Sequence, residues 1–147
     1  MKKYFLMLGI WFVVILGIIA GSAVYNHYKS SRYDESAHIF LKKTVPQLSN
    51  WDVDQIRLLM APEALERISD TTYNATITLF AKMGRLLSFD KPKFSQIHLE
   101  DKDRAIVEYT IDAKYENGDA ILTVNLLHED GQFKIYHFNV QSSALTN

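Results

Sequence analysis

The stretch AKYENGDAILTVNLLHEDGQFKIYHFNV, residues 113–140, decides the fold, because apolar and polar residues alternate along it between two turn signals. Alternation with a period of two predicts β-strands that bury one face. Asn117-Gly118 and Asp130-Gly131 are residue pairs favoured at the centres of two-residue hairpins. The stretch therefore predicts consecutive antiparallel strands.

Upstream sequence extends this pattern into an α+β domain. FSQIHLED and RAIVEYTIDAKYE also alternate, with a turn signal at Asp101-Lys102, and they complete a four-stranded meander over residues 93–142. Before residue 88 the apolar period is helical. It predicts helices over residues 34–48, 52–60, 63–68 and 71–87. Helices ahead of an antiparallel sheet define the α+β class, and we expect them to cover one face.

The predicted turns also fix the register of the strands. The first hairpin turn places Tyr109 opposite Leu126 on the face that the helices cover, and the second places Val124 opposite His137. Because the side-chain period is two, residues of the same parity on each strand share that face.

The last strand, GQFKIYHFNVQS (residues 131–142), breaks this alternation. Phe133 and Ile135 lie on one face, whereas Phe138 and Val140 have the opposite parity. Either Phe138 and Val140 lie on the far face of the sheet, or a one-residue bulge near Tyr136 turns them back towards the core. The sequence leaves both alternatives open.

The N-terminal segment predicts a membrane anchor. No charged residue occurs from Tyr4 to Asn26, and such a helix is long enough to cross a bilayer, which it would contact through residues 4–25. We expect an anchor or uncleaved signal at 1–26, a juxtamembrane linker at 27–33, a folded domain at 34–142 and a tail at 143–147. The alternative is a cleaved signal peptide, but its apolar region is usually only about 7 to 15 residues long.

Charge does not decide the orientation of this anchor, because lysine or arginine residues occur on both sides of it. Only a few residues precede the span, and the start of the chain is similar to a bacterial export signal. We therefore expect a single-pass protein of the bacterial inner membrane with a periplasmic C-terminal domain. The alternative is export after signal cleavage.

Composition argues against several classes of function. The 147-residue chain has a formal net charge of −1, so a nucleic-acid partner is not expected. It contains no cysteine, and its five histidines show no metal-ligand spacing. A glycine-rich phosphate loop is also missing. The sequence therefore predicts no metal and no cofactor.

Three features together resemble a known superfamily. They are the Trp51-Asp52 step, a helix ending in FAKMGRLL, and the meander that contains residues 113–140. The pattern is similar to the nuclear-transport-factor-like, cystatin-like (SnoaL-like) superfamily, and among its members to small exported or membrane-anchored bacterial proteins. This resemblance implies a cone of helices and curved sheet over roughly residues 34–142. The superfamily includes isomerases, dehydratases, ligand carriers and non-enzymatic assembly subunits.

The leading interpretation is a non-catalytic binding or assembly domain that acts through protein–protein contacts. No catalytic motif of the superfamily's enzymes matches this chain residue by residue. Apolar residues with far-face parity suggest an interface, either in a homodimer or with a membrane-protein partner. The candidates are Ile106, Ile121, Leu127, Phe138 and Val140.

Two alternatives stay open. One is a small-molecule-binding protein or an enzyme of the isomerase or dehydratase kind, with a pocket near Tyr109, Val124, His137 and Asn139. His137 is then a candidate general base, because histidine titrates near neutrality. The other is a subunit of an envelope-spanning secretion machine.

Overall fold

The structure is a computed structural model that describes residues 32–146. The chain divides into two compact units, residues 1–34 and 35–147, and nearly all of the described residues belong to the second unit. The expected anchor at 4–25 lies outside the described residues, as does nearly all of the linker at 27–33. No helix within residues 32–146 combines the length and the apolar character needed to cross a membrane.

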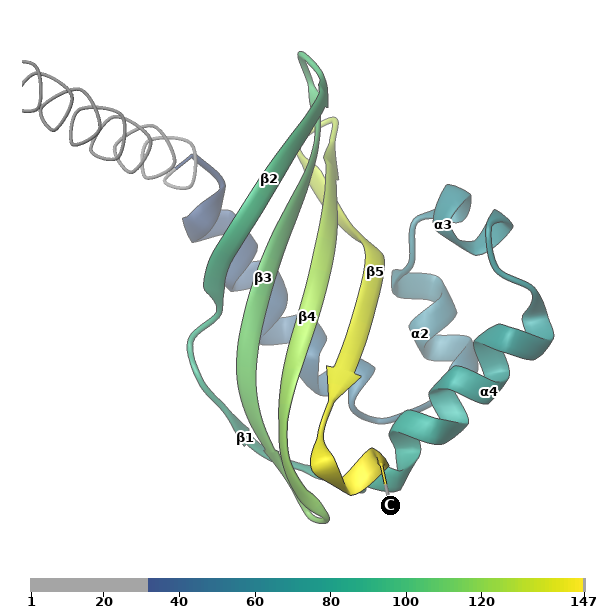
Figure 1. The fold of residues 1–147 in the computed structure, drawn as a ribbon. Helices are drawn as coiled ribbons and strands as arrows, with labels where there is room; N and C mark the ends of the chain where they lie inside the picture. Colours follow the sequence, from purple (N-terminus) through teal and green to yellow (C-terminus); the bar gives the residue numbers. More distant parts are fainter. Residues whose placement is uncertain (1–31, 147) are drawn as a thin grey trace, which may run out of the picture. The chain divides into compact units, whose positions relative to one another are not determined.

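The described chain is α+β, with helices followed by a curved antiparallel sheet of five strands (Figure 1). Residues 32–48 are helical. The helices after it are α2 (Val53–Leu59), α3 (Pro62–Glu66), α4 (Asp70–Phe80) and the 3-10 turn η1 (Ala81–Met83). The strands are β1 (Leu86–Phe89), β2 (Lys93–Asp101), β3 (Arg104–Tyr115), β4 (Gly118–Glu129) and β5 (Gln132–Gln141), and the 3-10 turn η2 (Ser143–Leu145) comes after β5. The predicted α+β class is confirmed.

Local signals start the helices where the sequence indicates. The Asp52 side chain accepts hydrogen bonds from the first turn of α2, and Ser69 caps α4 in the same way. Pro62 occupies the first position of α3, where its missing N–H has no cost. These short helices therefore begin at caps that the chain supplies itself.

The predicted helix over 71–87 is too long. α4 ends at Phe80, η1 continues to Met83, and Gly84 then adopts a φ of 76°. A Cβ on Gly84 would also lie only 2.9 Å from Glu116 Oε2. Both the positive φ and this lack of space therefore favour glycine here. Leu86–Phe89 instead forms β1, because the end of β3 extends past β2 and offers it a free edge. The sheet consequently has five strands rather than the predicted four.

The sheet has the order β1-β3-β4-β5, with β2 also paired to β3. β1 and β2 come one after the other along a single edge of β3, opposite residues 113–115 and 104–110 respectively. β5 forms the opposite edge of the sheet (Figure 1).

The register between β3 and β4 differs from the prediction by two residues. The turn comprises Glu116 and Asn117, so Tyr115 lies opposite Gly118 and Tyr109 lies opposite Val124 rather than Leu126. An even shift leaves every side chain on its predicted face. The predicted helix-covered face of β3 and β4 is therefore correct, although the predicted residue pairs are not.

The register of β5 resolves the two alternatives for its parity change. Asp130 and Gly131 form the turn as predicted, with φ values of 51° and 74°. Beyond Ile135, however, Tyr136 is an extra residue, and His137 pairs with Asn125 instead of Val124. The bulge places Phe138 opposite Val124 on the inner face.

The main core lies between helix 32–48 and the inner face of the sheet. Leu41 and Val45 on the helix are fully buried, as are Tyr109 and Leu126 on the strands. Helices α2, α3 and α4 lie beside β5, at the far edge of the sheet (Figure 1). The amphipathic stripe of helix 32–48 therefore covers the sheet that the strand alternation predicts.

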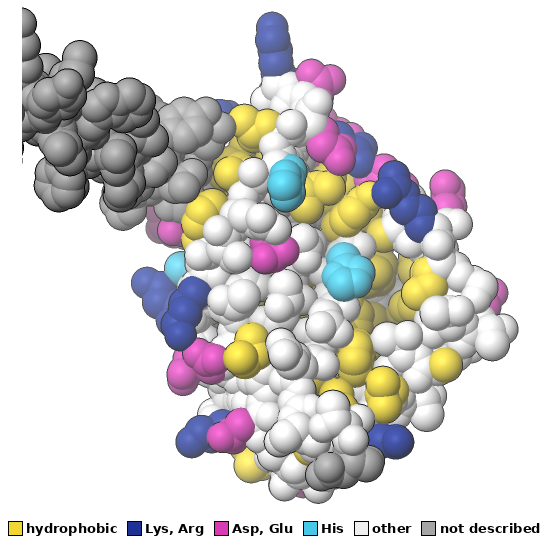
Figure 2. Space-filling view, viewed as in Figure 1, with side chains coloured by type: hydrophobic (Ala, Val, Ile, Leu, Met, Phe, Trp, Pro, Cys, Tyr) yellow, Lys and Arg dark blue, Asp and Glu magenta, His cyan; other side chains and the backbone are white. Residues whose placement is uncertain are grey.

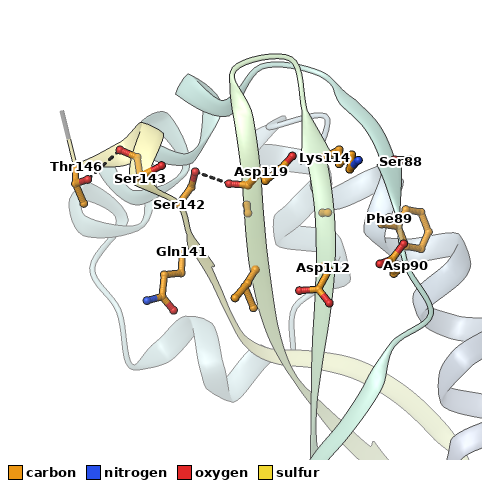
Figure 3. Close-up of a pocket in the computed structure, with 13 residues that line it drawn as sticks. Ser88, Phe89, Asp90, Asp112, Lys114, Asp119, Gln141, Ser142, Ser143 and Thr146 are labelled. Atoms are coloured by element: carbon orange, nitrogen blue, oxygen red, sulfur yellow. Dashed lines mark hydrogen bonds between the residues drawn. The ribbon is translucent and has the colours of Figure 1, made fainter.

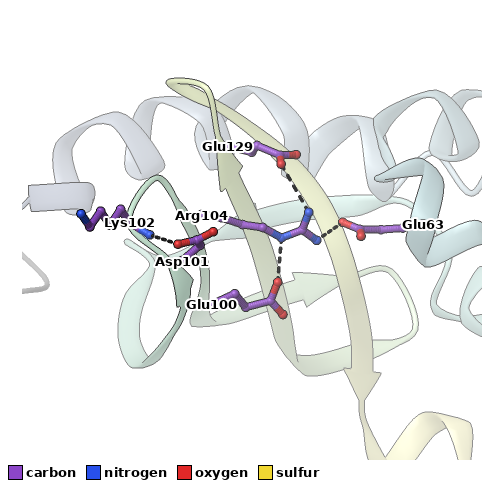
Figure 4. Close-up of polar contacts among 6 residues, drawn as sticks. All are labelled: Glu63, Glu100, Asp101, Lys102, Arg104 and Glu129. Atoms are coloured by element: carbon purple, nitrogen blue, oxygen red, sulfur yellow. Dashed lines mark hydrogen bonds and ion pairs between the residues drawn. The ribbon is translucent and has the colours of Figure 1, made fainter.

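A smaller apolar cluster lies under α3 on the outer face. Ala61 and Ala64 pack there against Ile106 and Leu127, all four of them buried. Ion pairs of Arg104 also attach α3 to the sheet. Its guanidinium binds Glu63 of α3 and, on the strands, Glu100 and Glu129 (Figure 4). Hydrogen bonds to Glu100 and Glu63 hold the pKa of Arg104 above its ordinary value. α3 is thus fastened across one end of the outer face.

Tyr115 joins the end of β3 to the first helix. Its hydroxyl group lies 2.9 Å from Ser49 Oγ, and both side chains are buried. Burial raises the pKa of the Tyr115 phenol, because the low-dielectric interior disfavours the phenolate. Folding therefore favours the protonated form.

We predict that Tyr115→Phe destabilises the protein by about 1 kcal/mol near neutral pH, because Ser49 loses its buried hydrogen-bond partner. Because burial raises the folded-state pKa of Tyr115 above the unfolded value of 10.0, the wild type has its full stability below pH 10. The contribution of the protonated Tyr115 hydroxyl is then lost as pH rises through the folded-state pKa. Denaturant unfolding of both proteins from neutral to strongly alkaline pH should give converging stability curves. Parallel curves would contradict this account.

Candidate binding groove

An open, largely apolar groove runs between β5 and the helices α3 and α4. Its volume is about 370 Å³. One wall comes from residues 136–139 of β5, and the other comes from α4 and the end of α3. Hydrophobic side chains line a hollow between the sheet and these helices in the space-filling view (Figure 2).

The α4 wall results from helical spacing. Tyr73, Ile77 and Phe80 recur on one stripe, and all three are buried. Thr76 lies beside them and lines the groove, with its hydroxyl group donating to the carbonyl of Thr72 at 2.8 Å. The wall is therefore apolar, apart from a threonine whose hydroxyl is already bonded within the helix.

The β5 wall owes its composition to the bulge. Phe138 turns inward, and its ring centroid lies 5.7 Å from that of Phe80. His137 and Asn139 are exposed and pair with Asn125 and Thr123 of β4, which carry side chains on the outer face. Residues from both faces of the strand thus reach the groove, because it lies along the strand's edge.

Aromatic rings close the floor of the groove. Beyond Phe138 and Phe80, the ring of Trp51 lies 6.4 Å from Phe80 and 5.6 Å from Tyr115. The indole N–H of Trp51 donates to the carbonyl of Gly84 at 2.8 Å, which fixes the ring. The space behind these rings is a void of only about 10 Å³, smaller than a ligand requires. The groove therefore stops at the aromatic floor.

A cationic group stands at the mouth of the groove. Arg67, the residue that ends α3, places its guanidinium 5.7 Å from the ring centroid of Tyr136. Arg67 is exposed, and no carboxylate of residues 32–146 forms an ion pair with it. By contrast, nearby Arg57 binds Asp70 at 3.0 Å and lies over the Tyr73 ring. The Arg67 guanidinium can therefore bind a carboxylate of another molecule.

The backbone of β5 is covered only at one end of the groove. Met60 forms an isolated parallel bridge with Ile135, and the Ala61 N–H donates to the Ile135 carbonyl at 2.7 Å. Within residues 32–146, no backbone hydrogen bond from outside the sheet reaches Phe138. The edge of β5 is therefore open where it borders the groove.

The structure does not bring together the four residues of the predicted small-molecule pocket. Tyr109 and Val124 are 0% and 1% exposed and belong to the packed core. His137 and Asn139 do line a cavity, but it is the groove at the edge of β5. The bulge separates these pairs, because it moves His137 off the inner face that holds Tyr109.

The predicted interface residues do not form one exposed surface either. Ile106 and Leu127 lie on the outer face as predicted, but α3 covers them. Phe138 and Val140 point inward because of the bulge, and Val140 is buried. Of the five candidates, Ile121 alone remains largely exposed, at 45%.

Two further open cavities lie away from the groove. One of about 610 Å³ contains Asp112, Asp119 and Lys114 on the outer face, together with Gln141 and the C-terminal turn (Figure 3). Asp112 is already bound there by Lys93 at 2.7 Å. The other, of about 690 Å³, lies between helix 32–48 and the β1–β2 connection. Residues 32–146 contain no cluster of three acidic or histidine side chains arranged to hold a metal ion.

Sequence reasoning missed Arg67 and Thr76 as groove residues. The stripe of Tyr73, Ile77 and Phe80 has the helical spacing that predicts a buried face, and all three residues are buried. Thr76 and Arg67 line the groove only because α3 and α4 lie beside β5. No local pattern in the sequence carries that information.

No model of a known protein family matches this chain, and no curated protein matches its sequence. The resemblance to the nuclear-transport-factor-like superfamily therefore remains a prediction from turns and apolar positions.

We predict that His137→Ala changes the free energy of unfolding by less than about 0.5 kcal/mol, because His137 is exposed, and substitutions at exposed positions usually change stability little. Chemical denaturation of the variant and the wild type measures this difference. A loss of several kcal/mol would mean that His137 supports the fold, in conflict with its exposed position.

Proposed function

We propose that this protein is a membrane-anchored, exported binding domain that acts through protein–protein contacts rather than catalysis. The observation that carries this proposal is the groove beside β5, an open apolar surface next to a strand edge. The partner that we propose is another protein of the bacterial envelope. Such a partner could be one component of a secretion machine or of another membrane assembly.

The packed interior supports binding over chemistry on a small molecule. Enzyme and carrier pockets usually enclose most of their ligand within several hundred cubic ångströms. Here the inner face of the sheet is filled by helix 32–48, and the space behind the aromatic floor is about 10 Å³. The interior therefore gives no support to the isomerase or dehydratase alternative.

The polar groups around the groove also suit recognition better than catalysis. Catalysis needs an acid, base or nucleophile set beside a second group that activates or orients it. Within residues 32–146, no hydrogen bond of the His137 side chain is found, and Arg67 cannot act as a base because guanidinium stays protonated. Arg67 can instead select a partner by its charge.

The anchoring and export parts of the proposal rest on the uncharged segment from residue 4 to 25. A tether would hold the groove close to the membrane surface and limit its partners to proteins nearby. Tethering also raises the effective concentration of the domain toward such partners, so that modest affinity suffices.

We predict that the protein stays with the inner membrane after alkaline washing, and that protease added to intact spheroplasts digests the C-terminal domain. Both results are expected if residues 4–25 span the bilayer with the domain outside. Release of the domain into the soluble periplasm would show that the signal is cleaved. Protection until the spheroplasts are lysed would show that the orientation is wrong.

A photo-reactive side chain tests binding through the groove in living cells. We predict that a photo-reactive phenylalanine analogue at Thr76, which lines the groove, yields discrete cross-linked species with other envelope proteins. Thr78 is the matched control, because it lies on the same helix, is exposed, and makes the same hydrogen bond to a carbonyl four residues earlier. Identical cross-linking patterns, or none, from the two positions would contradict the proposal.

A further inference from the structure

We propose that the groove binds an extended peptide segment of its partner, which pairs with β5 as an additional strand and places an acidic side chain on Arg67. This inference rests on the proposed function and specifies its partner. Three observations carry it: the orientation of the Phe138 backbone, the difference between the two sheet edges, and the charge at the mouth of the groove.

The backbone orientation is fixed by one hydrogen bond and the strand register. In an antiparallel pair, residues alternate between those whose N–H and C=O face the neighbouring strand and those whose groups face away. The Ile135 carbonyl faces away from β4, because it accepts from Ala61. Ile135 pairs with Leu126, and past the bulge Phe138 pairs with Val124, two residues along β4. Phe138 therefore presents its own N–H and C=O to the groove.

The chain itself shows how a segment can pair with this edge. Met60 and Ala61 already bridge β5 at Ile135, where they act as a short added strand. The groove begins where this bridge ends, and a peptide lying in it would continue the same line of pairing past Phe138. Addition of a strand to a sheet edge is a common mode of peptide recognition.

The opposite edge of the sheet is protected along its length, whereas β5 carries its bulge and Lys134 before the segment that runs past Phe138. β2 has two register irregularities, and it carries charged residues such as Lys93, Glu100 and Asp101. Bulges and charges of this kind keep other strands from adding to an edge. Beyond its bulge, β5 continues regularly from His137 to Val140 without a lysine, a carboxylate or a proline.

Charge specifies the chemistry of the occupant. Arg67 stands at the mouth of the groove above Tyr136 and has no carboxylate partner within residues 32–146. The groove walls are otherwise mostly apolar, with Phe138 and Ile77 among them. Their other polar members, Thr76, His137 and Asn139, carry no charge at neutral pH or titrate near it. The fitting segment thus alternates apolar residues, which enter the groove, with polar ones, and has an acidic side chain near one end.

Binding of synthetic peptides to the full-length protein in detergent micelles tests this inference. The probe is a pool of fluorescent peptides about eight residues long, acetylated and amidated, in which valine, isoleucine and tyrosine alternate with serine and glutamate. A second pool has lysine in place of glutamate. We expect the acidic pool to bind about tenfold more tightly or better, as measured by fluorescence anisotropy. Equal binding, or no binding, would overturn the inference.

Two variants locate the binding. Arg67→Glu should reverse the preference between the pools, whereas Lys91→Glu, an exposed charge change on the β1–β2 connection, should leave it unchanged. Thr76→Trp should fill the groove and weaken binding about tenfold or more, whereas Thr78→Trp should not. Circular dichroism establishes that each variant is folded. If Thr76→Trp does not fold, Arg67→Glu decides alone, and an unchanged preference would overturn the inference.

Strand pairing is tested separately from groove binding. Peptides of the acidic pool that are N-methylated at alternate residues cannot donate along one edge, and we expect them to lose about tenfold in affinity or more. Hydrogen exchange at the Phe138 amide should slow when the unmethylated pool binds. If photo-cross-linking from position 76 succeeds but methylation and Phe138 exchange have no effect, the strand-pairing inference fails and the proposed function stands. If neither cross-linking nor peptide binding occurs, both fail.

Discussion

The extra residue at Tyr136 sets which face each residue of the second half of β5 occupies, and both the inner core there and the groove depend on it. Before it, Ile135 contributes to the inner core, and after it Phe138 and Val140 return to the same face. Without the bulge, two large apolar side chains would point to the outer face and His137 would enter the core. The bulge therefore completes the core and, at the same point, exposes His137 and Asn139 along the strand's edge.

Helices α3 and α4 lie beside the edge of β5 and leave an open groove along it. Residues 60–61 pair with Ile135, and α3 then crosses onto the outer face, where Arg104 binds Glu63. α4 returns along β5 at a distance set by ring contacts, with Phe80 between Phe138 and Trp51. Apolar walls, an open strand edge and the unpaired charge of Arg67 consequently meet in one place. These features suit the peptide recognition proposed above, and the space behind the aromatic floor is only about 10 Å³.

Much of this fold could be predicted from local patterns. The α+β class, the helical starts near residues 53, 62 and 70, the Asp130-Gly131 turn and the helix-covered face all result from caps, periodicity and turn chemistry. The first hairpin register was wrong by two residues, because Gly118 comes after the turn rather than lying within it. β1 was missed because a four-residue apolar strand after a helix continues a helical pattern, and only the free end of β3 makes it a strand.

The candidate site was far less predictable than the fold. The sequence alone determined that residues 131–142 change parity, and it limited the outcome to an apolar outer face or a bulge. Tertiary structure decided between them, because the bulge buries Val140 in the inner face and places Phe138, half-buried, on that same face. The groove required more, since Arg67 and Thr76 lie far from Phe138 along the chain and meet it only when α3 and α4 dock beside β5. The alternation of side chains along a strand predicts which face of the sheet each residue occupies. It does not predict which distant helix will lie beside the edge of that sheet.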